Sequence, residues 1–350
     1  MIISRTPYRI SFFGGGTDYP SWYREFGGQV LSGTIDKYIY ISCRYLPPFF
    51  EHRVRLVYSK VEACSGVEEI EHPAARAILK AHQVLTGVEI HYDGDLPARS
   101  GMGSSSAFSV GLINAVSAYT GLSRTKRDLA EEAIDLEQNI LGEMVGSQDQ
   151  VNAAYGGLNH IIFHPGGEIE VRQPSISAAR RDQLKENLML FYTGIMRTAE
   201  TVASSYLENL VEQRDRLARM GQFVDEALDI LSGDRDLDCF GELLHENWRE
   251  KRRLSELVSN SRVDEIYQAA RSAGALGGKL TGAGGGGMML LYVPKERQAQ
   301  VRKKLSHLLY IPFDFSLSGS EIIFRDIQTT YDEVVSRPAE LERFIEVDEL

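Results

Sequence analysis

The segment at residues 97–108 reads PARSGMGSSSAF, and it constrains the fold more than any other stretch of this chain. Gly101 and Gly103 precede three consecutive serines, Ser104–Ser106, and a hydrophobic run that predicts a helix over 104–120. Glycines let the backbone curl so that successive N–H groups point into one hollow, where the positive end of the helix dipole also lies. One serine is enough to cap a helix. Three serines after two glycines therefore favour a phosphate-binding loop over a plain helix cap.

Composition excludes several classes of function. The 350 residues are 43% hydrophobic and 25% charged, as in a soluble globular protein of one large or two ordinary domains. The net charge of -11 argues against a binder of nucleic acid or of anionic membranes, because no basic surplus is present to contact phosphate backbones. Three widely spaced cysteines, and an N-terminus interrupted by Arg5, Pro7 and Arg9, predict a cytoplasmic protein without a signal peptide.

Hydrophobic patterns predict strands and helices in two lobes of an α+β fold. In the first half we expect strands at 9–13, 38–46, 54–59 and 88–97, and helices at 104–120 and 125–141. In the second half we expect helices at 198–232, 236–258, 262–274 and 295–308, and strands at 188–194, 288–294 and 313–325. The sequence changes character near 175–185, which predicts domains at 1–178 and 179–350.

Two further glycine-rich loops flank the first in sequence. They read FFGGGTDYP at residues 12–20 and KLTGAGGGGMMLLY at residues 279–292. The latter contains a formal G-x-G-x-x-G pattern, but a strand follows it where a dinucleotide-binding motif needs a helix. Each loop alone is as typical of an ordinary turn as of a ligand site. Their combination is more informative than any one of them.

Two carboxylates follow the phosphate-loop candidate. Glu137 shares a helical face with apolar residues, where a carboxylate is costly unless it is paired or holds a cation. Asp149 lies in the first turn of a new helix that Ser147 would cap, and the helix dipole favours an ionised carboxylate there. An edge position for Glu137 and a purely structural role for Asp149 remain open. Together with an anion-binding loop, the two residues suit phosphoryl transfer, with one as metal ligand and the other as base.

Along nearly its whole length the chain resembles the GHMP kinase superfamily, which includes galactokinase and the homoserine and mevalonate kinases. RTPYRISFFGGGTDYP, LPARSGMGSSSAF and KLTGAGGGG match its three motifs in order. Within the superfamily, GSSSAFSVGLINA and EQNILGEMVGSQDQVNAAYGG most resemble the D-glycero-D-manno-heptose 7-phosphate kinases. The resemblance implies an N-terminal lobe like ribosomal protein S5, a ferredoxin-like C-terminal lobe, and ATP and Mg²⁺ as cofactors. It further implies phosphorylation of the anomeric hydroxyl to a 1,7-bisphosphate, a precursor of nucleotide-activated heptose for surface glycans.

The resemblance also implies roles for individual residues. Asp149 would be the base, and Arg9 would lie near the transferring phosphoryl group. ATP would contact Gly101, Met102, Gly103, Ser104, Ser105 and Ser106, and Mg²⁺ would be held by Ser105 and Glu137. The sugar would contact Gly15, Gly16, Thr17, Asp18, Gly282, Gly284 and Gly285.

Two departures from the family pattern bear on the substrate. Met102 stands where the family has leucine, a change that conserves volume. Gly15 and Gly16 stand where galactokinases carry Glu-His, which opens room for a longer sugar. Alternatives are a kinase for fucose or another unphosphorylated sugar, and a non-catalytic sensor of ATP and sugar. A decarboxylase of the superfamily fits least, because the sugar-type first loop is present.

A phosphorylated sugar needs local cations, which an acidic protein must supply from a few residues. The candidates outside the ATP motifs are Arg44, Arg197 and Lys251. Arg197 is our first choice, since it follows the strand LMLFYTG in a loop expected at the cleft. The expected partners are therefore ATP and a sugar phosphate, without nucleic acid or membrane, and the sequence leaves the oligomeric state open.

Overall fold

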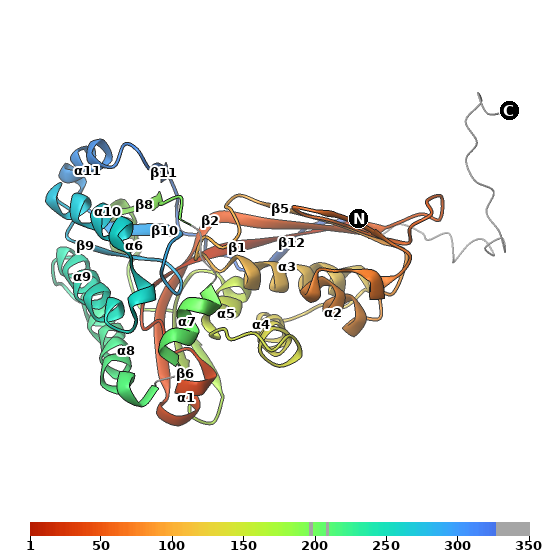
Figure 1. The fold of residues 1–350 in the computed structure, drawn as a ribbon, viewed down its shortest axis with the longest axis horizontal. Coiled ribbons are helices and arrows are strands. Elements are labelled where there is room, and N and C mark those ends of the chain that lie inside the picture. The colour runs from red at the N-terminus through yellow and green to blue at the C-terminus, as the bar shows by residue number, and fades with distance from the viewer. Residues whose placement is uncertain (196–198, 208–209, 327–350) are drawn as a thin grey trace.

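The computed structural model describes residues 1–195, 199–207 and 210–326, and their strands form two sheets (Figure 1). The first sheet has eight strands, in the order β12-β1-β2-β5-β3-β4, with β6 on β2 and β7 on β6. The second has four strands, in the order β11-β8-β10-β9. Each sheet carries its own helices, which confirms the α+β class. Among the described residues, no helix has the length and apolar character needed to cross a bilayer.

Two long strands organise the first sheet. β2 pairs with β1 along most of its length, with β6 through its first half and with β5 through its second half. All pairings in this sheet are antiparallel except that of β3 with β5. The strands are β1 (Ile2–Phe13), β2 (Gly28–Tyr45), β3 (Val54–Val57), β4 (Val61–Cys64), β5 (Val88–Gly94), β6 (Leu158–Phe163), β7 (Ile169–Arg172) and β12 (Glu321–Arg325).

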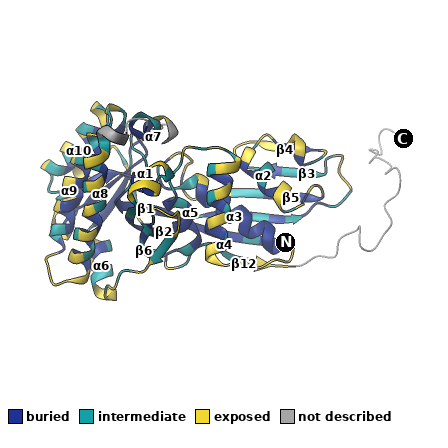
Figure 2. Cartoon of the chain, turned by 90° about the horizontal axis from the view of Figure 1, so that it is seen from below, coloured by how far each residue is buried: buried dark blue, intermediate teal, exposed yellow. Residues whose placement is uncertain are grey.

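Helix α3 (Ser104–Tyr119) is the centre of the N-terminal part. It packs on β1 and β2 and is buried on nearly every side, as the dark blue of Figure 2 shows. A helix that is apolar all round suits such a position. Its neighbours are α2 (Pro73–Ala81), α4 (Lys126–Asp135) and α5 (Gln148–Tyr155), and a short α1 (Pro20–Phe26) follows the first glycine-rich loop. A π-helical turn, Leu136–Ile140, extends α4.

The second sheet holds β8 (Leu188–Tyr192), β9 (Gly277–Leu280), β10 (Met288–Tyr292) and β11 (Leu309–Ile311), all antiparallel. Helix α9 packs on β9, and α8 packs on α9 and on β1 and β2 of the first sheet. The helices of this part are α6 (Ala178–Glu186), α7 (Ala199–Leu207), α8 (Leu210–Ser232), α9 (Asp238–Arg252), α10 (Ser261–Ser272) and α11 (Gln298–Lys304).

Aromatic packing and buried polar contacts join the two parts. Phe240 of α9 packs edge-on against Phe12 and Phe13 of β1, at ring-centroid distances of 5.7 and 5.1 Å. Asn247 and Lys279 both donate hydrogen bonds to the Phe12 carbonyl, at 3.4 and 3.0 Å. The first glycine-rich loop begins with Phe12 and Phe13, so these contacts hold its N-terminal end in place.

Several predicted elements are confirmed, and others are wrong in extent. The helix expected at 236–258 ends at Arg252, because Ser255 caps a separate 3₁₀ turn, Glu256–Val258. The strand expected at 313–325 is limited to β12, with an isolated bridge between Phe315 and Ile35 before it. Two helices, α7 and α8, stand where one was expected over 198–232, and residues 208–209 between them lie outside the described residues. The boundary between residues 178 and 179 stays a prediction.

Candidate active site

The three glycine-rich loops line one pocket of about 750 Å³ between the two parts. Loop one contributes Gly15, Gly16 and Asp18, and loop three contributes residues 281–284 and Gly286. Loop two contributes Gly101 and residues 103–106 at the start of α3. Three segments that are far apart in sequence therefore face the same space, as the sequence patterns indicated.

The second loop presents the N-terminus of α3 to the pocket. Gly103 is the residue before the helix and has a left-handed backbone, φ 75°, that favours glycine. No side chain caps the helix. The three serines, Ser104–Ser106, are its first residues. The first N–H groups of a helix have no partner within it. The start of α3 thus offers N–H groups, hydroxyls and a positive dipole end to an anion.

The second and third loops are packed against each other. Ser100 accepts a hydrogen bond from Met288 N, at 3.1 Å, and Gly101 lies next to Thr281 and Gly282. A Cβ on Gly282 would lie 2.8 Å from Gly101 Cα, and the backbone of Gly282 is left-handed, φ 69°. Glycine is required here by close approach as well as by conformation.

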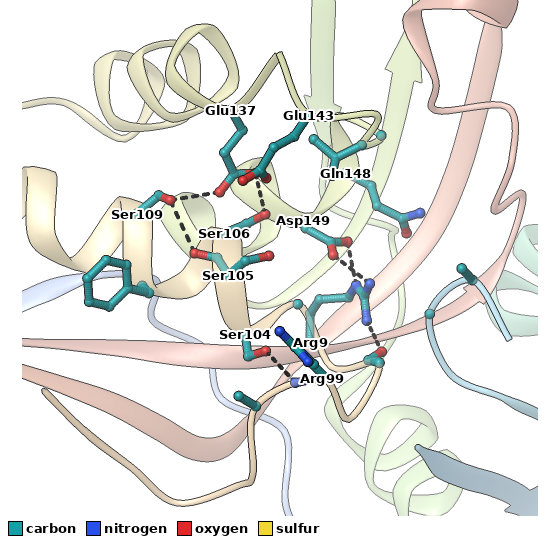
Figure 3. Close-up of a pocket in the computed structure, with 18 of the residues that line it drawn as sticks. Arg9, Arg99, Ser104, Ser105, Ser106, Ser109, Glu137, Glu143, Gln148 and Asp149 are labelled. Carbon is teal, nitrogen blue, oxygen red and sulfur yellow. Dashed lines mark hydrogen bonds and ion pairs between the residues drawn. The ribbon is translucent and has the colours of Figure 1, made fainter. Parts of the chain in front are cut away.

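Arg9 and Asp149 form an ion pair beside the second loop. Arg9 donates from Nε and Nη2 to the two carboxylate oxygens of Asp149, each at 2.7 Å, and from Nη1 to the Gly101 carbonyl at 2.7 Å (Figure 3). Arg9 lies on β1 and is 5% exposed, and Asp149 lies in the first turn of α5. A guanidinium with this planar, two-point contact fixes the orientation of the carboxylate.

Glu137 is a buried carboxylate at the pocket, in the π-helical turn. Ser106 and Ser109 donate their hydroxyl protons to it, at 2.8 and 2.7 Å (Figure 3), and Gln150 adds a third hydrogen bond. Burial raises the pKa of Glu137 to about 7, although the three hydrogen bonds lower it. Carboxylate and hydroxyl oxygens are ligands that Mg²⁺ prefers, so Glu137 and the serines beside it fit the expected metal.

Asp18 is held rigidly at the other side of the pocket. Its carboxylate accepts hydrogen bonds from Gly16 N at 2.9 Å and from Gln148 Nε2 at 2.8 Å. Gly146 presses against it, and a Cβ on that residue would lie 2.0 Å from Asp18 Oδ2. Burial raises the pKa of Asp18. The hydrogen bonds from loop one and α5 thus fix the orientation of the Asp18 carboxylate at the side of the pocket.

An aromatic wall, formed by Tyr58, His72, Tyr92 and Phe108, lines the end of the pocket beyond the phosphate-loop candidate. His72 packs on Phe108 with ring centroids 4.7 Å apart, and Tyr58 packs edge-on against His72 at 5.2 Å. Glu62 accepts the Tyr58 hydroxyl at 2.8 Å and the backbone N–H of His72 at 3.2 Å. The sequence patterns missed this wall, because its residues are scattered over four segments with no shared motif.

Other predicted residues take different positions. Met102 is fully buried in the core, and only its carbonyl serves the site, as acceptor for Arg9 N at 3.1 Å. Thr17 and Gly285 do not line the pocket. The Thr17 hydroxyl bonds to the carbonyl of Gly14 at 2.8 Å, and Gly285 N donates to the Val258 carbonyl at 2.8 Å. These contacts shape the first and third loops from behind.

The predicted cations for a substrate phosphate separate into three cases. Arg44 lies away from the pocket and pairs with Glu89, which is buried on the same sheet, so that candidate is wrong. Arg197 lies outside the described residues. Lys251, in the last turn of α9, does line the pocket. Ser105 also lines it, but the hydroxyls that reach Glu137 are those of Ser106 and Ser109.

Comparison with known families matches both halves of the chain. A model described as the GHMP kinases N terminal domain matches residues 69–157, and one described as the GHMP kinases C terminal matches residues 223–311. The first of these ranges contains the second loop, Glu137 and Asp149. The second contains Lys251 and the third loop.

Individual relatives cover nearly the whole chain. A D-glycero-alpha-D-manno-heptose 7-phosphate kinase from Campylobacter jejuni is 28% identical over 330 residues, which are 91% of this chain and 96% of that protein. A mevalonate kinase from Pyrococcus abyssi is 27% identical over 87% of this chain and 93% of its own length. These two matches therefore extend over most of both chains.

Solved structures share the fold. A protein from Bacteroides thetaiotaomicron, described as a D-glycero-D-manno-heptose 1-phosphate kinase, superimposes with a TM-score of 0.76 at 22% identity, over 94% of this chain and 100% of that one. Lactococcus lactis galactokinase, solved with galactose, superimposes with a TM-score of 0.71 at 18% identity, over 91% of this chain and 94% of that one. The two-part architecture is thus the one found in these kinases.

Proposed function

Because the chain belongs to the GHMP kinases, we propose that it phosphorylates the anomeric hydroxyl of D-glycero-D-manno-heptose 7-phosphate with ATP. It is a phosphotransferase that acts on an alcohol group of a sugar. The product would be the 1,7-bisphosphate, a precursor for nucleotide-activated heptose. The observation that carries the proposal is the Arg9–Asp149 pair, which faces a pocket shared with the N-terminus of α3 and the buried Glu137.

ATP would lie along the second loop. The N–H groups and serine hydroxyls at the start of α3 would bind its phosphates, and the aromatic wall would pack against its base. Ser105 and Glu137 would hold Mg²⁺, which neutralises charge on the nucleotide phosphates when bound. Glu137 needs to be ionised for this role.

The acceptor would lie between the first and third loops. Asp18 would accept hydrogen bonds from sugar hydroxyls, and its fixed carboxylate would select their direction. A side chain on Gly15 would enter the space next to Ser11 and Gln148, since its Cβ would lie 3.7 and 3.9 Å from them. The absence of a side chain there leaves room for an acceptor longer than a hexose.

Asp149 would take the proton from the anomeric hydroxyl. The oxygen that loses this proton forms a bond to the γ-phosphorus as the bond from that phosphorus to the β–γ bridging oxygen breaks, and ADP leaves. Arg9, already bonded to Asp149, would stabilise negative charge on the transferring group. The hydrogen bond from Arg9 to the Gly101 carbonyl holds the guanidinium next to the phosphate-loop candidate.

A panel of acceptors assayed with Mg-ATP tests the proposal. The panel holds D-glycero-D-manno-heptose 7-phosphate, the same heptose without phosphate, fucose, galactose and mevalonate. We expect a value of kcat/KM for the heptose phosphate at least about 10-fold above every other acceptor, because a charged contact is worth roughly 1.5–3 kcal/mol. Equal activity on heptose and heptose phosphate would contradict the proposal. ATP binding without turnover on any sugar would favour a sensor.

The cell compartment that we infer is the cytoplasm, where ATP is present. The three cysteines, Cys43, Cys64 and Cys239, are free thiols, as a reducing compartment favours.

A further inference from the structure

Lys251 is a buried ammonium group at the pocket. It lies in the last turn of α9, is 3% exposed, and donates from Nζ to the carbonyl of Gly282 in the third loop. Within the described residues, no carboxylate lies close enough to form an ion pair with it. An ammonium group has three N–H donors, and the backbone carbonyl uses one.

This arrangement is costly in the absence of a ligand. A charge that is removed from water and has only a neutral acceptor destabilises the fold. Burial is the largest cause that lowers the pKa of Lys251, the charge of Arg9 lowers it as well, and Asp18 opposes them, so that the pKa is about 8. Lys251 is therefore close enough to both Arg9 and Asp18 to feel their charges, on the side of the pocket where the first and third loops meet.

The other cations of the pocket have assigned partners or lie elsewhere. Among the described residues that line it, Arg9, Arg99 and Lys251 are the lysines and arginines. Arg9 uses three of its N–H groups for Asp149 and Gly101. Arg99 belongs to the second loop, which we propose to bind the ATP phosphates, so its guanidinium lies on the nucleotide side of the pocket. Of these three described cations, Lys251 is therefore the one that is available to bind a negative group of the acceptor.

We propose that Lys251 binds the phosphate monoester of the acceptor sugar, an assignment that rests on the function proposed above. A phosphate monoester carries nearly two negative charges at neutral pH and accepts several hydrogen bonds. It supplies the counter-charge that Lys251 lacks, next to the carboxylate of Asp18 that would hold the sugar hydroxyls. Lys251 would then distinguish phosphorylated from unphosphorylated acceptors.

The test is the KM for two acceptors, D-glycero-D-manno-heptose 7-phosphate and the same heptose without phosphate. Lys251→Met removes the charge and keeps an unbranched side chain that is shorter by one heavy atom. Lys279→Met is the matched control, because Lys279 is equally buried and also donates to a backbone carbonyl, that of Phe12, but does not line the pocket. For Lys251→Met we expect the KM for the heptose phosphate to rise about 10- to 100-fold. The KM values for ATP and for unphosphorylated heptose should change less than about 3-fold, and Lys279→Met should leave the ratio of the two acceptors unchanged.

Inorganic phosphate provides a second readout. In the wild type it should inhibit competitively against the heptose phosphate, and Lys251→Met should raise that inhibition constant by a similar factor. Lys251→Gln repeats both measurements if the methionine variant does not fold. Unchanged KM and inhibition constants in a folded variant would overturn the assignment, as would an equal loss on both acceptors. A wild type that does not use the heptose phosphate at all would instead overturn the proposed function.

Discussion

At the scale of single residues, buried polar groups that face the pocket mark the site. Arg9, Asp18, Glu137 and Lys251 are each 5% exposed or less. Each is oriented by contacts to a backbone group or to a neutral or charged side chain. Burial of such groups is unfavourable for folding, so their concentration at one pocket is more typical of function than of stability.

Asp149, the ion-pair partner of the buried Arg9, is the proposed base, and its replacement tests that role. Asp149→Asn should lower kcat by about 100-fold or more and leave ATP binding close to that of the wild type, because the amide cannot take the proton. The change also breaks the two-point contact with Arg9, so thermal unfolding must be measured to confirm a folded variant. A folded Asp149→Asn enzyme with near-normal turnover would remove Asp149 from the mechanism.

The proposed metal ligands can be tested by titration of activity with Mg²⁺. Ser105→Ala and Glu137→Gln should each raise the Mg²⁺ concentration for half-maximal activity, because the first removes a proposed oxygen ligand and the second removes the negative charge of the other. Ser109→Ala is the matched control, since the Ser109 hydroxyl donates to Glu137 from the neighbouring turn of α3. Its shift should be smaller than that of Glu137→Gln. Titrations of Ser105→Ala and Glu137→Gln that superimpose on the wild type would show that these side chains are structural.

The buried charge of Lys251 predicts a dependence of stability on pH. The pKa of Lys251 is about 8 in the folded protein against 10.5 as an ordinary value, so below pH 8 both states carry the proton and folding bears the whole burial penalty. Lys251→Met should therefore be more stable than the wild type at pH 7, by roughly 2 kcal/mol. Between pH 8 and 10.5 the wild type loses the proton only when folded, and the difference should shrink. Denaturant unfolding at pH 7, 8.5 and 10 measures it, and a wild type more stable at pH 7 would contradict it.

At the scale of elements, local patterns predicted what local forces determine. The phosphate-loop candidate and α3 follow from Gly103 and the apolar run after it, and the structure starts the helix at Ser104 as the sequence indicated. The 18-residue strand β2 was only half predicted, because Gly33 interrupts the pattern of its first half. The Cβ of a larger residue at Gly33 would lie 3.3 Å from Leu158, so the side chain of a neighbouring strand limits the size of the residue at this position.

The π-helical turn that carries Glu137 could not be predicted from the sequence either, because contacts from a distant segment stabilise it. Gln138 donates from Nε2 to the carbonyl of Val145 and to Ser147 Oγ, at 3.1 and 3.0 Å, and so draws the loop before α5 towards this turn. Such contacts depend on where α5 lies in the fold. The sequence placed Glu137 on a helix and near the site, but it did not identify Ser106 and Ser109 as the serines that donate to its carboxylate.

Contact between the second and third loops gives a prediction at this scale. Gly282→Ala should force the loops apart, since its Cβ would lie 2.8 Å from Gly101 Cα, and should raise the KM for ATP several-fold. Gly121→Ala is the matched control. Gly121 has a similar left-handed backbone, φ 83°, but nothing lies within 4 Å of its added Cβ. The two variants should lose similar stability from backbone strain, and equal KM values for ATP in both would argue against a functional contact between the loops.

At the scale of the whole molecule, the sequence predicted two lobes but not how the chain returns between them. β12 follows the second sheet in sequence and pairs with β1 of the first, and the Arg5 side chain forms an ion pair with Glu321 at 2.9 Å across this pairing. The aromatic wall, which the sequence analysis missed, reaches the same pocket as Lys251 from the opposite part of the molecule. The position of this wall depends on contacts between residues distant in sequence, which no local pattern encodes.

The return of β12 predicts that the N-terminal part does not fold alone. A fragment of residues 1–175 lacks β12, which leaves the hydrogen-bonding edge of β1 unpaired, and lacks Phe240, which exposes Phe12 and Phe13. We expect this fragment to aggregate or to unfold without a cooperative transition. Production together with residues 176–350, which keep Ser177 as the cap of α6, should restore a soluble complex with kinase activity. Near-UV circular dichroism and denaturant unfolding measure the outcome. Cooperative unfolding of 1–175 alone, at the midpoint of the intact chain, would show instead that the first sheet is complete without its last strand.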